Sequence, residues 1–130
     1  MIKQVMIGSK RYDIRQDKVV LLDGEQVGAK FEGETSTIVI ADTLGIGAKP
    51  HALMHEIVHS VLFDGGYIAE NDNEKLVNDL AQQIILLIRQ NPHLIRYIQD
   101  TGTVYQATVC MPSTQLGDEQ IPMMDGDEDD

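Results

Sequence analysis

The sequence predicts an α+β fold, with strands in the first third of the chain and helices after them. Three observations indicate this class. Residues 1–42 consist of short apolar or β-branched segments separated by turn signals, and residues 50–63 contain no helix breaker. In residues 71–90 the apolar side chains recur at helical spacing. The length of 130 residues suits one compact domain.

Four short strands are expected before residue 42. The turns that separate them are carried by Gly8-Ser9-Lys10, by Asp23-Gly24 and by Gly33-Glu34. The last segment, Thr35 to Ile40, is β-branched and has the best strand character in the chain. The weaker segments could instead be extended loops. The expected strands cover residues 2–7, 12–14, 19–22 and 35–40.

A helix is predicted over residues 50–63. Proline suits the first turn of a helix, and Asp64-Gly65-Gly66 ends it. Apolar residues surround much of its circumference, so we expect this helix to be buried and its polar side chains to need partners. The apolar residues are Leu53, Met54, Ile57, Val58, Val61 and Leu62.

A second helix is predicted to begin near Asn71 or Asp72, either of which could cap it, and to end near Gln90. Asn91-Pro92 interrupts it, and residues 93–99 should form a short third helix. Residues 104–111 could add a strand, which would give one domain over residues 1–111. The inner face of the second helix is expected to contain Leu76, Val77, Leu80, Ala81, Ile84, Leu87 and Ile88.

The charge of the chain is concentrated at its end. The formal net charge is −11, and seven of the 21 acids lie in residues 118–130. Residues 112–130 are therefore predicted to be a disordered acidic tail. The rest of the chain has 14 acids against 10 bases, which disfavours direct binding to nucleic acid or to an anionic membrane.

Nothing in the sequence indicates a secretory or membrane protein. The single cysteine, Cys110, has no internal disulfide partner, and the first ten residues lack the apolar core of a signal peptide. The longest aliphatic run, residues 84–88, is far shorter than the ~20 residues that span a bilayer. We therefore expect a cytoplasmic protein.

A metal site is predicted within the first helix, at His55-Glu56-Ile57-Val58-His59. Two histidines four residues apart lie on one helical face and can bind the same zinc ion. Glu56 is directed to the side where a zinc-bound water would lie, so it could take the proton of that water as a general base. The alternative, two histidines that are merely satisfied in a core, is disfavoured by the unbroken apolar helix around them.

A catalytic zinc ion needs a third protein ligand, and Glu74 is the best candidate. Helical spacing places it beside the inner face of the second helix, whereas Asp72 and Asp79 point toward water. Asn78, one turn later, could orient a ligand. Glu74 could instead be a first-turn carboxylate that complements the helix dipole, and Asn78 a polar boundary residue. The other downstream acids considered are Asp64 and Glu70.

The sequence assigns no specific role in the site to several further polar residues. His51 lies about 12 Å along the helix axis from His59, too far to share an ion with it. Tyr67, His93 and Tyr97 could each stabilise an oxyanion, but the sequence does not choose among them.

These motifs resemble the ImmA/IrrE-type metallopeptidases over roughly residues 1–100. The HExxH helix is followed, after a short loop, by Glu74-Lys-Leu-Val-Asn78-Asp-Leu-Ala81, which is similar to the ExxxN second helix of that family. The closest likeness is to the minimal versions among phage and prophage proteins. The resemblance implies a small twisted, mainly antiparallel sheet packed on the HExxH helix and a second ligand-bearing helix, as in zincins. It also implies one zinc ion per chain at His55, His59 and Glu74, with Glu56 as general base.

The leading hypothesis is therefore a zinc-dependent endopeptidase that cleaves a protein substrate, which the resemblance implies could be a repressor-like regulator. The alternative is a zincin-fold binding or regulatory protein whose metal is structural or whose catalysis is vestigial. Intact Glu56 favours the peptidase, because a structural zinc ion has no use for a base there. A third hypothesis is an interaction protein whose acidic tail binds a basic partner.

Overall fold

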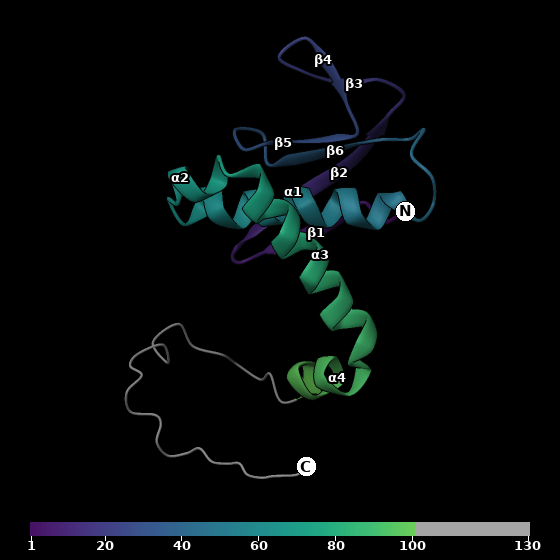
Figure 1. Cartoon of the computed structure of the whole chain (residues 1–130), viewed down its shortest axis with the longest axis vertical. Helices are drawn as coiled ribbons and strands as arrows, with labels where there is room; N and C mark the ends of the chain where they lie inside the picture. The colour runs from purple at the N-terminus through teal and green to yellow at the C-terminus, as the bar shows by residue number, and fades with distance from the viewer. Residues whose placement is uncertain (101–130) are drawn as a thin grey trace. The chain divides into compact units, whose positions relative to one another are not determined.

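The computed structural model describes residues 1–100, which form six strands and four helices (Figure 1). The predicted α+β class is confirmed. The strands are β1 (Gln4–Ile7), β2 (Lys10–Asp17), β3 (Val20–Leu22), β4 (Glu25–Val27), β5 (Ala29–Glu32) and β6 (Thr37–Ala41). The helices are α1 (Ala48–Asp64), α2 (Ile68–Asn71), α3 (Glu74–Gln90) and α4 (Pro92–Asp100).

The chain divides into two compact units, Met1–Asn91 and a second that begins at Pro92. The described part of the second unit contains α4, whose bounds nearly match those of the short third helix predicted over residues 93–99. The predicted strand over residues 104–111, the tail over residues 112–130 and the predicted domain boundary between them lie outside the described residues. No helix within residues 1–100 combines the length and apolar character that a membrane span needs.

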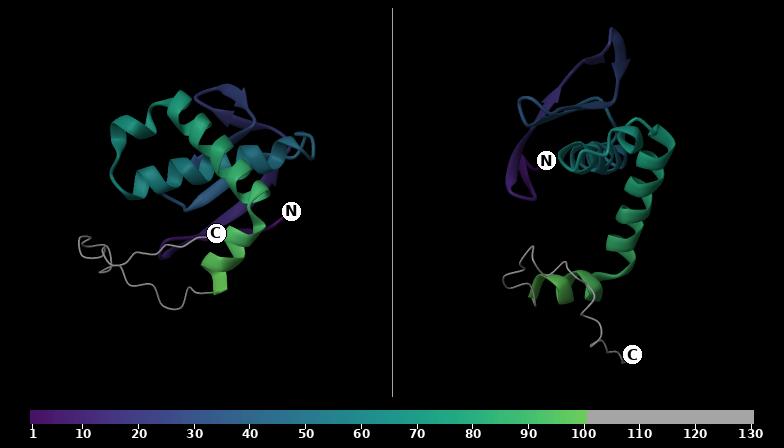
Figure 2. Two further views of the ribbon diagram at one scale, coloured as in Figure 1. Left: turned by 60° about the horizontal axis from the view of Figure 1, so that its bottom comes forward. Right: turned by 90° about the vertical axis from the view of Figure 1, so that its left-hand side faces the viewer.

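A mixed four-stranded sheet, with the order β1-β2-β6-β5, organises the first unit. The pairs β1–β2 and β5–β6 are antiparallel, whereas the central pair β2–β6 is parallel, with Ile14 opposite Ile38. The strands β3 and β4 form a separate antiparallel hairpin. The sheet lies between this hairpin and α1 (Figures 1 and 2).

Strand β6 is the centre of the core, because all five of its residues are buried. Ile38 and Ile40 face α1 and pack with Ile14. Val39 and Ala41 point to the other face and pack with Val20 of the hairpin. A strand covered on both faces has a continuous apolar sequence, which is why this segment has the best strand character in the chain.

The turn at Asp23-Gly24 is the two-residue connection of the β3–β4 hairpin, as the sequence predicts. Both residues have positive φ, 52° for Asp23 and 82° for Gly24, as a tight hairpin turn requires. The strands β4 and β5 were not predicted. Their segments contain charged residues, and their extended conformation depends on pairing with β3 and β6.

Helix α1 begins at Ala48, two residues before the predicted start, so Pro50 lies at its third position. The expectation that the helix is buried is only partly correct, because Val61 and Phe63 are 49% and 50% exposed. One face of α1 packs on the sheet and another on α3, and the remaining sector faces solvent.

Helix α3 begins later than predicted, and Asn73 is its cap rather than Asn71 or Asp72. The Asn73 side chain accepts a hydrogen bond from the backbone N–H of Leu76 at 3.1 Å. The buried residues of this helix are Val77, Ala81 and Ile85. The predicted inner face is only partly correct, because it omits the buried Ile85 and includes Leu80, Leu87 and Ile88, which are exposed.

Candidate metal centre

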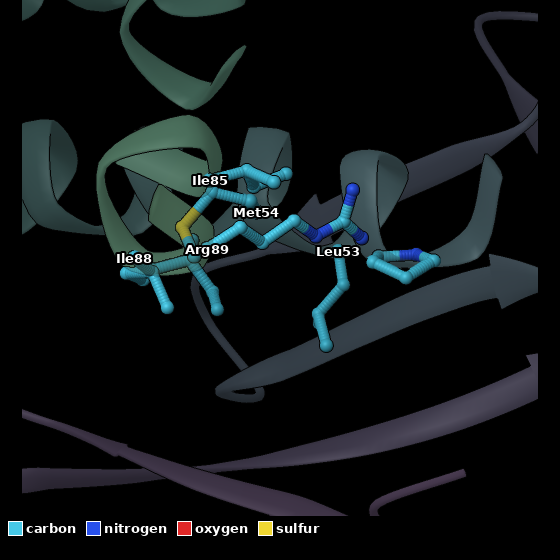
Figure 3. A pocket seen from close by; sticks show the side chains of 7 residues that line it. Leu53, Met54, Ile85, Ile88 and Arg89 are labelled. Carbon is cyan, nitrogen blue, oxygen red and sulfur yellow. The ribbon is translucent and has the colours of Figure 1, made fainter. Parts of the chain in front are cut away.

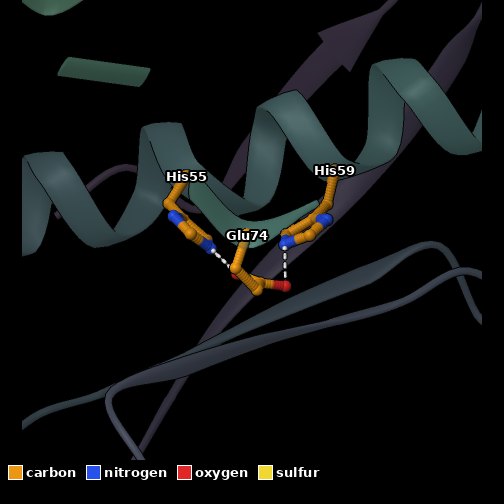
Figure 4. Close-up of side chains that lie close together, drawn as sticks. All are labelled: His55, His59 and Glu74. Carbon is orange, nitrogen blue, oxygen red and sulfur yellow. Dashed lines mark hydrogen bonds and ion pairs between the residues drawn. The ribbon is translucent and has the colours of Figure 1, made fainter. Parts of the chain in front are cut away.

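Three side chains from α1 and α3 meet at one point (Figure 4). The Nε2 atom of His55 lies 3.0 Å from Oε1 of Glu74, and the Nε2 atom of His59 lies 3.2 Å from Oε2 of the same carboxylate. The candidate ligand atoms all lie within 4.8 Å of one another. The structure therefore brings together the three residues that the sequence selects, and their role as metal ligands stays a prediction.

Local structure explains why these side chains meet. His55 and His59 are four residues apart in α1, so their rings lie on one face, with centroids 4.8 Å apart. After α1 ends, Gly66 adopts a φ of 78°, and the Tyr67 N–H donates to the carbonyl of Leu62 at 2.9 Å. This turn sends the chain back along α1, and Glu74 becomes the first residue of α3.

Each histidine also has an asparagine oxygen at its second ring nitrogen. Oδ1 of Asn78 lies 3.0 Å from Nδ1 of His55, a position that fits the orienting role predicted for Asn78. Oδ1 of Asn71 lies 2.6 Å from Nδ1 of His59. The sequence does not predict this contact, because its pattern indicates Asn71 only as a possible helix cap. The four residues of α2 are too few to show the periodicity that would have placed Asn71 on the face toward His59.

The polar groups around the two rings are compatible with a bound cation. Each imidazole lies between two oxygen acceptors, one amide and one carboxylate, but a neutral imidazole carries only one N–H. A cation bound at both Nε2 atoms and at Glu74 would remove this shortage of hydrogen-bond donors, because each Nδ1–H can then donate to its amide oxygen. Without a cation, neutral rings are satisfied only if both amides turn their nitrogen toward Nδ1.

The distances also fit zinc. Ligand atoms at 2.0–2.1 Å from a tetrahedral zinc ion lie about 3.3 Å apart, close to the 3.0 and 3.2 Å between Nε2 and carboxylate oxygen atoms. Two imidazoles and one carboxylate are a common ligand set of catalytic zinc. The residues present therefore offer the donor atoms that zinc takes, and these atoms lie within 4.8 Å of one another.

Glu56 lies beside the centre and is buried, with 7% of its surface exposed. Among residues 1–100 no hydrogen bond to its carboxyl group is found. Burial raises the pKa of Glu56 to about 7, and the negative charge of Glu74 adds to this effect while His59 opposes it. A buried acid without a hydrogen-bond partner is costly to the fold, which indicates a role other than stability.

The centre is open to solvent on the side of Glu74. The side chain of Glu74 is 68% exposed, whereas those of His55 and His59 are 20% and 13% exposed. A small molecule or a peptide could therefore reach the ligand atoms from this side. The arrangement differs from a closed structural site, in which protein ligands surround the ion.

The other acids considered from the sequence lie elsewhere in the unit. Asp64 accepts from the Tyr12 hydroxyl at 3.2 Å and pairs with Lys10, and Asp79 pairs with Lys75 at 2.7 Å. Glu70 and Asp72 are exposed, as is His51. Within residues 1–100, His55, His59 and Glu74 are the one set of three such side chains close enough to share an ion.

Two further residues of uncertain role, His93 and Tyr97, belong to α4 in the second unit, and Tyr67 is 56% exposed next to the turn after α1. None of the three is selected by the geometry as an oxyanion-stabilising group.

A separate cavity of about 220 Å³ lies between α1 and α3 (Figure 3). Its lining is apolar apart from the side chain of Arg89, so it offers neither a metal ligand nor a nucleophile. The lining residues are Pro50, Leu53, Met54, Ile57, Ile85, Ile88 and Arg89.

Comparisons of the chain with protein-family models, with curated proteins and with solved structures find no match.

Proposed function

We propose that this chain is a zinc metallopeptidase of the ImmA/IrrE type that hydrolyses a peptide bond in a protein substrate. One observation carries the proposal. The Nε2 atoms of His55 and His59 converge on the carboxylate of Glu74, next to the buried acid Glu56. Two imidazoles, a carboxylate and an adjacent general base are the groups that zinc-dependent hydrolysis needs.

In this proposal His55, His59 and Glu74 hold one zinc ion, which when bound lowers the pKa of water to about 7 and polarises a carbonyl group. Glu56 acts as the general base that takes a proton from the attacking water. It then donates this proton to the leaving amine, so that the carboxylate is restored after each turnover. Asn78 orients the ring of His55 by accepting a hydrogen bond from its Nδ1–H.

Burial of Glu56 supports catalysis over a purely structural metal. A structural site gains nothing from a buried carboxylate that lacks hydrogen-bond partners within the described residues, whereas a base benefits from low solvent access. The exposed side of Glu74 further supports an accessible ion. The resemblance of the motifs leaves a repressor-like regulator as the proposed substrate, in the cytoplasm of a cell that carries a phage or prophage.

The first test combines metal analysis with hydrolysis of an unfolded fluorogenic casein. We expect about one zinc ion per chain, and we expect Glu56→Gln to keep the ion while lowering the cleavage rate about 10²–10⁴-fold, because the base is lost. Glu70→Gln, which changes an exposed acid of α2, is the matched control and should cleave as the wild type does.

Two outcomes would overturn the proposal. One is a correctly folded chain with far less than one zinc ion after gentle purification. The other is a Glu56→Gln variant that cleaves as fast as the wild type.

A second prediction concerns the third ligand. Glu74→Ala should weaken zinc binding strongly, because two imidazoles alone would remain, whereas Asp72→Ala should leave zinc affinity unchanged. Both changes remove an exposed acid near the start of α3, so their effects on net charge are equal. Competition with a chromogenic chelator measures both affinities, and equal losses would exclude Glu74 as a specific ligand.

A further inference from the structure

Asn71 makes the shortest polar contact of the centre. Its Oδ1 atom lies 2.6 Å from Nδ1 of His59, compared with 3.0 Å between Asn78 and His55. Asn71 is half-buried, whereas Asn78 is exposed. A hydrogen bond shielded from water competes less with solvent, so Asn71 should restrain its histidine more strongly than Asn78 does.

The backbone around Asn71 is tied to the helix that carries His59. The Asn71 N–H donates to the carbonyl of Tyr67 at 2.9 Å, and the Tyr67 N–H donates to the carbonyl of Leu62, three residues after His59. The Tyr67 ring also lies against Gly65, where a Cβ atom would approach it to 2.8 Å. The amide of Asn71 is thus held at a defined position relative to His59.

We infer that Asn71 is the positioning residue of His59, an inference that rests on the proposed zinc site. Its carbonyl oxygen accepts the Nδ1–H of His59, which fixes the tautomer whose Nε2 lone pair is free for the metal. Asn71 and Asn78 then have equivalent tasks, one for each histidine. They lie on opposite sides of Glu74 in the sequence, three residues before it and four residues after it.

The experiment measures zinc affinity by chelator competition in the full chain. Asn71→Ala should raise the zinc Kd about 10–100-fold, the usual cost of losing such a partner, and Asn78→Ala should raise it less. Asn71→Asp should restore most of the affinity, because a carboxylate oxygen still accepts the Nδ1–H. Asp72→Ala is the neighbouring control, and it should bind zinc as the wild type does.

A second readout does not need zinc. The ¹⁵N chemical shifts of the imidazole nitrogens in the metal-free chain report the partners of each ring. Asn71→Ala should move the Nδ1 shift of His59 and leave His55 unchanged, and Asn78→Ala should do the reverse. This readout also applies to a variant that folds but no longer binds metal.

The outcomes separate the inference from the proposed function. If the wild type binds zinc and Asn71→Ala binds it equally well, or if the His59 shifts do not respond to Asn71→Ala, the inference is wrong. If the wild type binds no zinc, the proposed function is wrong, and the ring shifts still decide whether Asn71 holds His59.

Discussion

Glu56 is the one carboxylic acid among residues 1–100 that is buried. It lies between His55 and Ile57 in α1, and Val58 and Ser60 are the other buried residues of the helix. A glutamine of the same shape would carry no charge into this environment. Because the ionised carboxylate of Glu56 is costly to bury, Glu56 reduces the stability of the metal-free fold.

This cost should depend on pH. Because the folded pKa is raised from 4.5 to about 7, folded and unfolded chains bind the proton equally below about pH 4.5. Stability is then lost as the pH rises, and the loss is complete above about pH 7. Glu56→Gln should therefore stabilise the metal-free chain by roughly 3 kcal/mol more at pH 8 than at pH 4.

Denaturant unfolding in the presence of a chelator measures this difference, with Glu70→Gln as the exposed control. A stability gain that is the same at both pH values would show that Glu56 is not forced to ionise in an apolar environment.

The sequence predicted most of the residues that meet at the centre, because their positions follow from helical periodicity. His55, Glu56 and His59 share one uninterrupted helix, and Glu74 could be placed on the flank of α3 from its angle to Val77. Asn71 could not be placed in this way, because α2 is a single turn whose orientation depends on the tertiary contacts of the glycine turn.

At the scale of elements, the start of α3 decides where Glu74 lies. Asn73 caps this helix through its bond to the Leu76 N–H, and Glu74 is the next residue. A carboxylate in the first turn is also favourable for the helix dipole. Both roles that the sequence left open for Glu74 are therefore compatible with its position.

Asn73→Ala should lower the free energy of unfolding by about 1 kcal/mol, because the first turn of α3 loses its cap. It should also weaken zinc binding, since fraying of that turn displaces Glu74. Asn73→Asp keeps an acceptor at the cap and should preserve both properties. Urea unfolding and chelator competition measure the two effects. Loss of stability with no change in zinc affinity would show that the cap does not position Glu74.

Strands β4 and β5 and the buried face of α3 were not predicted correctly, because they depend on tertiary contacts. The extended segments Glu25–Val27 and Ala29–Glu32 have no clear alternation of apolar residues, and they become strands by pairing with β3 and β6. For α3, the periodicity identified an apolar face but left Ile85 out of it. It could not show that the neighbouring helices cover only Val77, Ala81 and Ile85.

At the scale of the whole molecule, one unit contains all the residues of the centre that lie within the described part of the chain. The unit Met1–Asn91 includes both histidines, Glu56, Glu74 and the two asparagines. Its layers place β6 between the β3–β4 hairpin and α1, so the helix that carries the histidines packs on the most buried strand. The helix packed on this strand thus carries the first two proposed ligands, while the third comes from a separate helix.

The eight residues from Asn71 to Asn78 supply three of the polar groups of the centre. They contribute the carboxylate and both amide oxygens, and all three groups approach α1 from the same short stretch. Local opening of this stretch would withdraw them together without disturbing the sheet. If the centre binds the proposed zinc ion, ion occupancy and the order of the stretch are thermodynamically linked, and a protein that captured these residues in an open form would expel the ion.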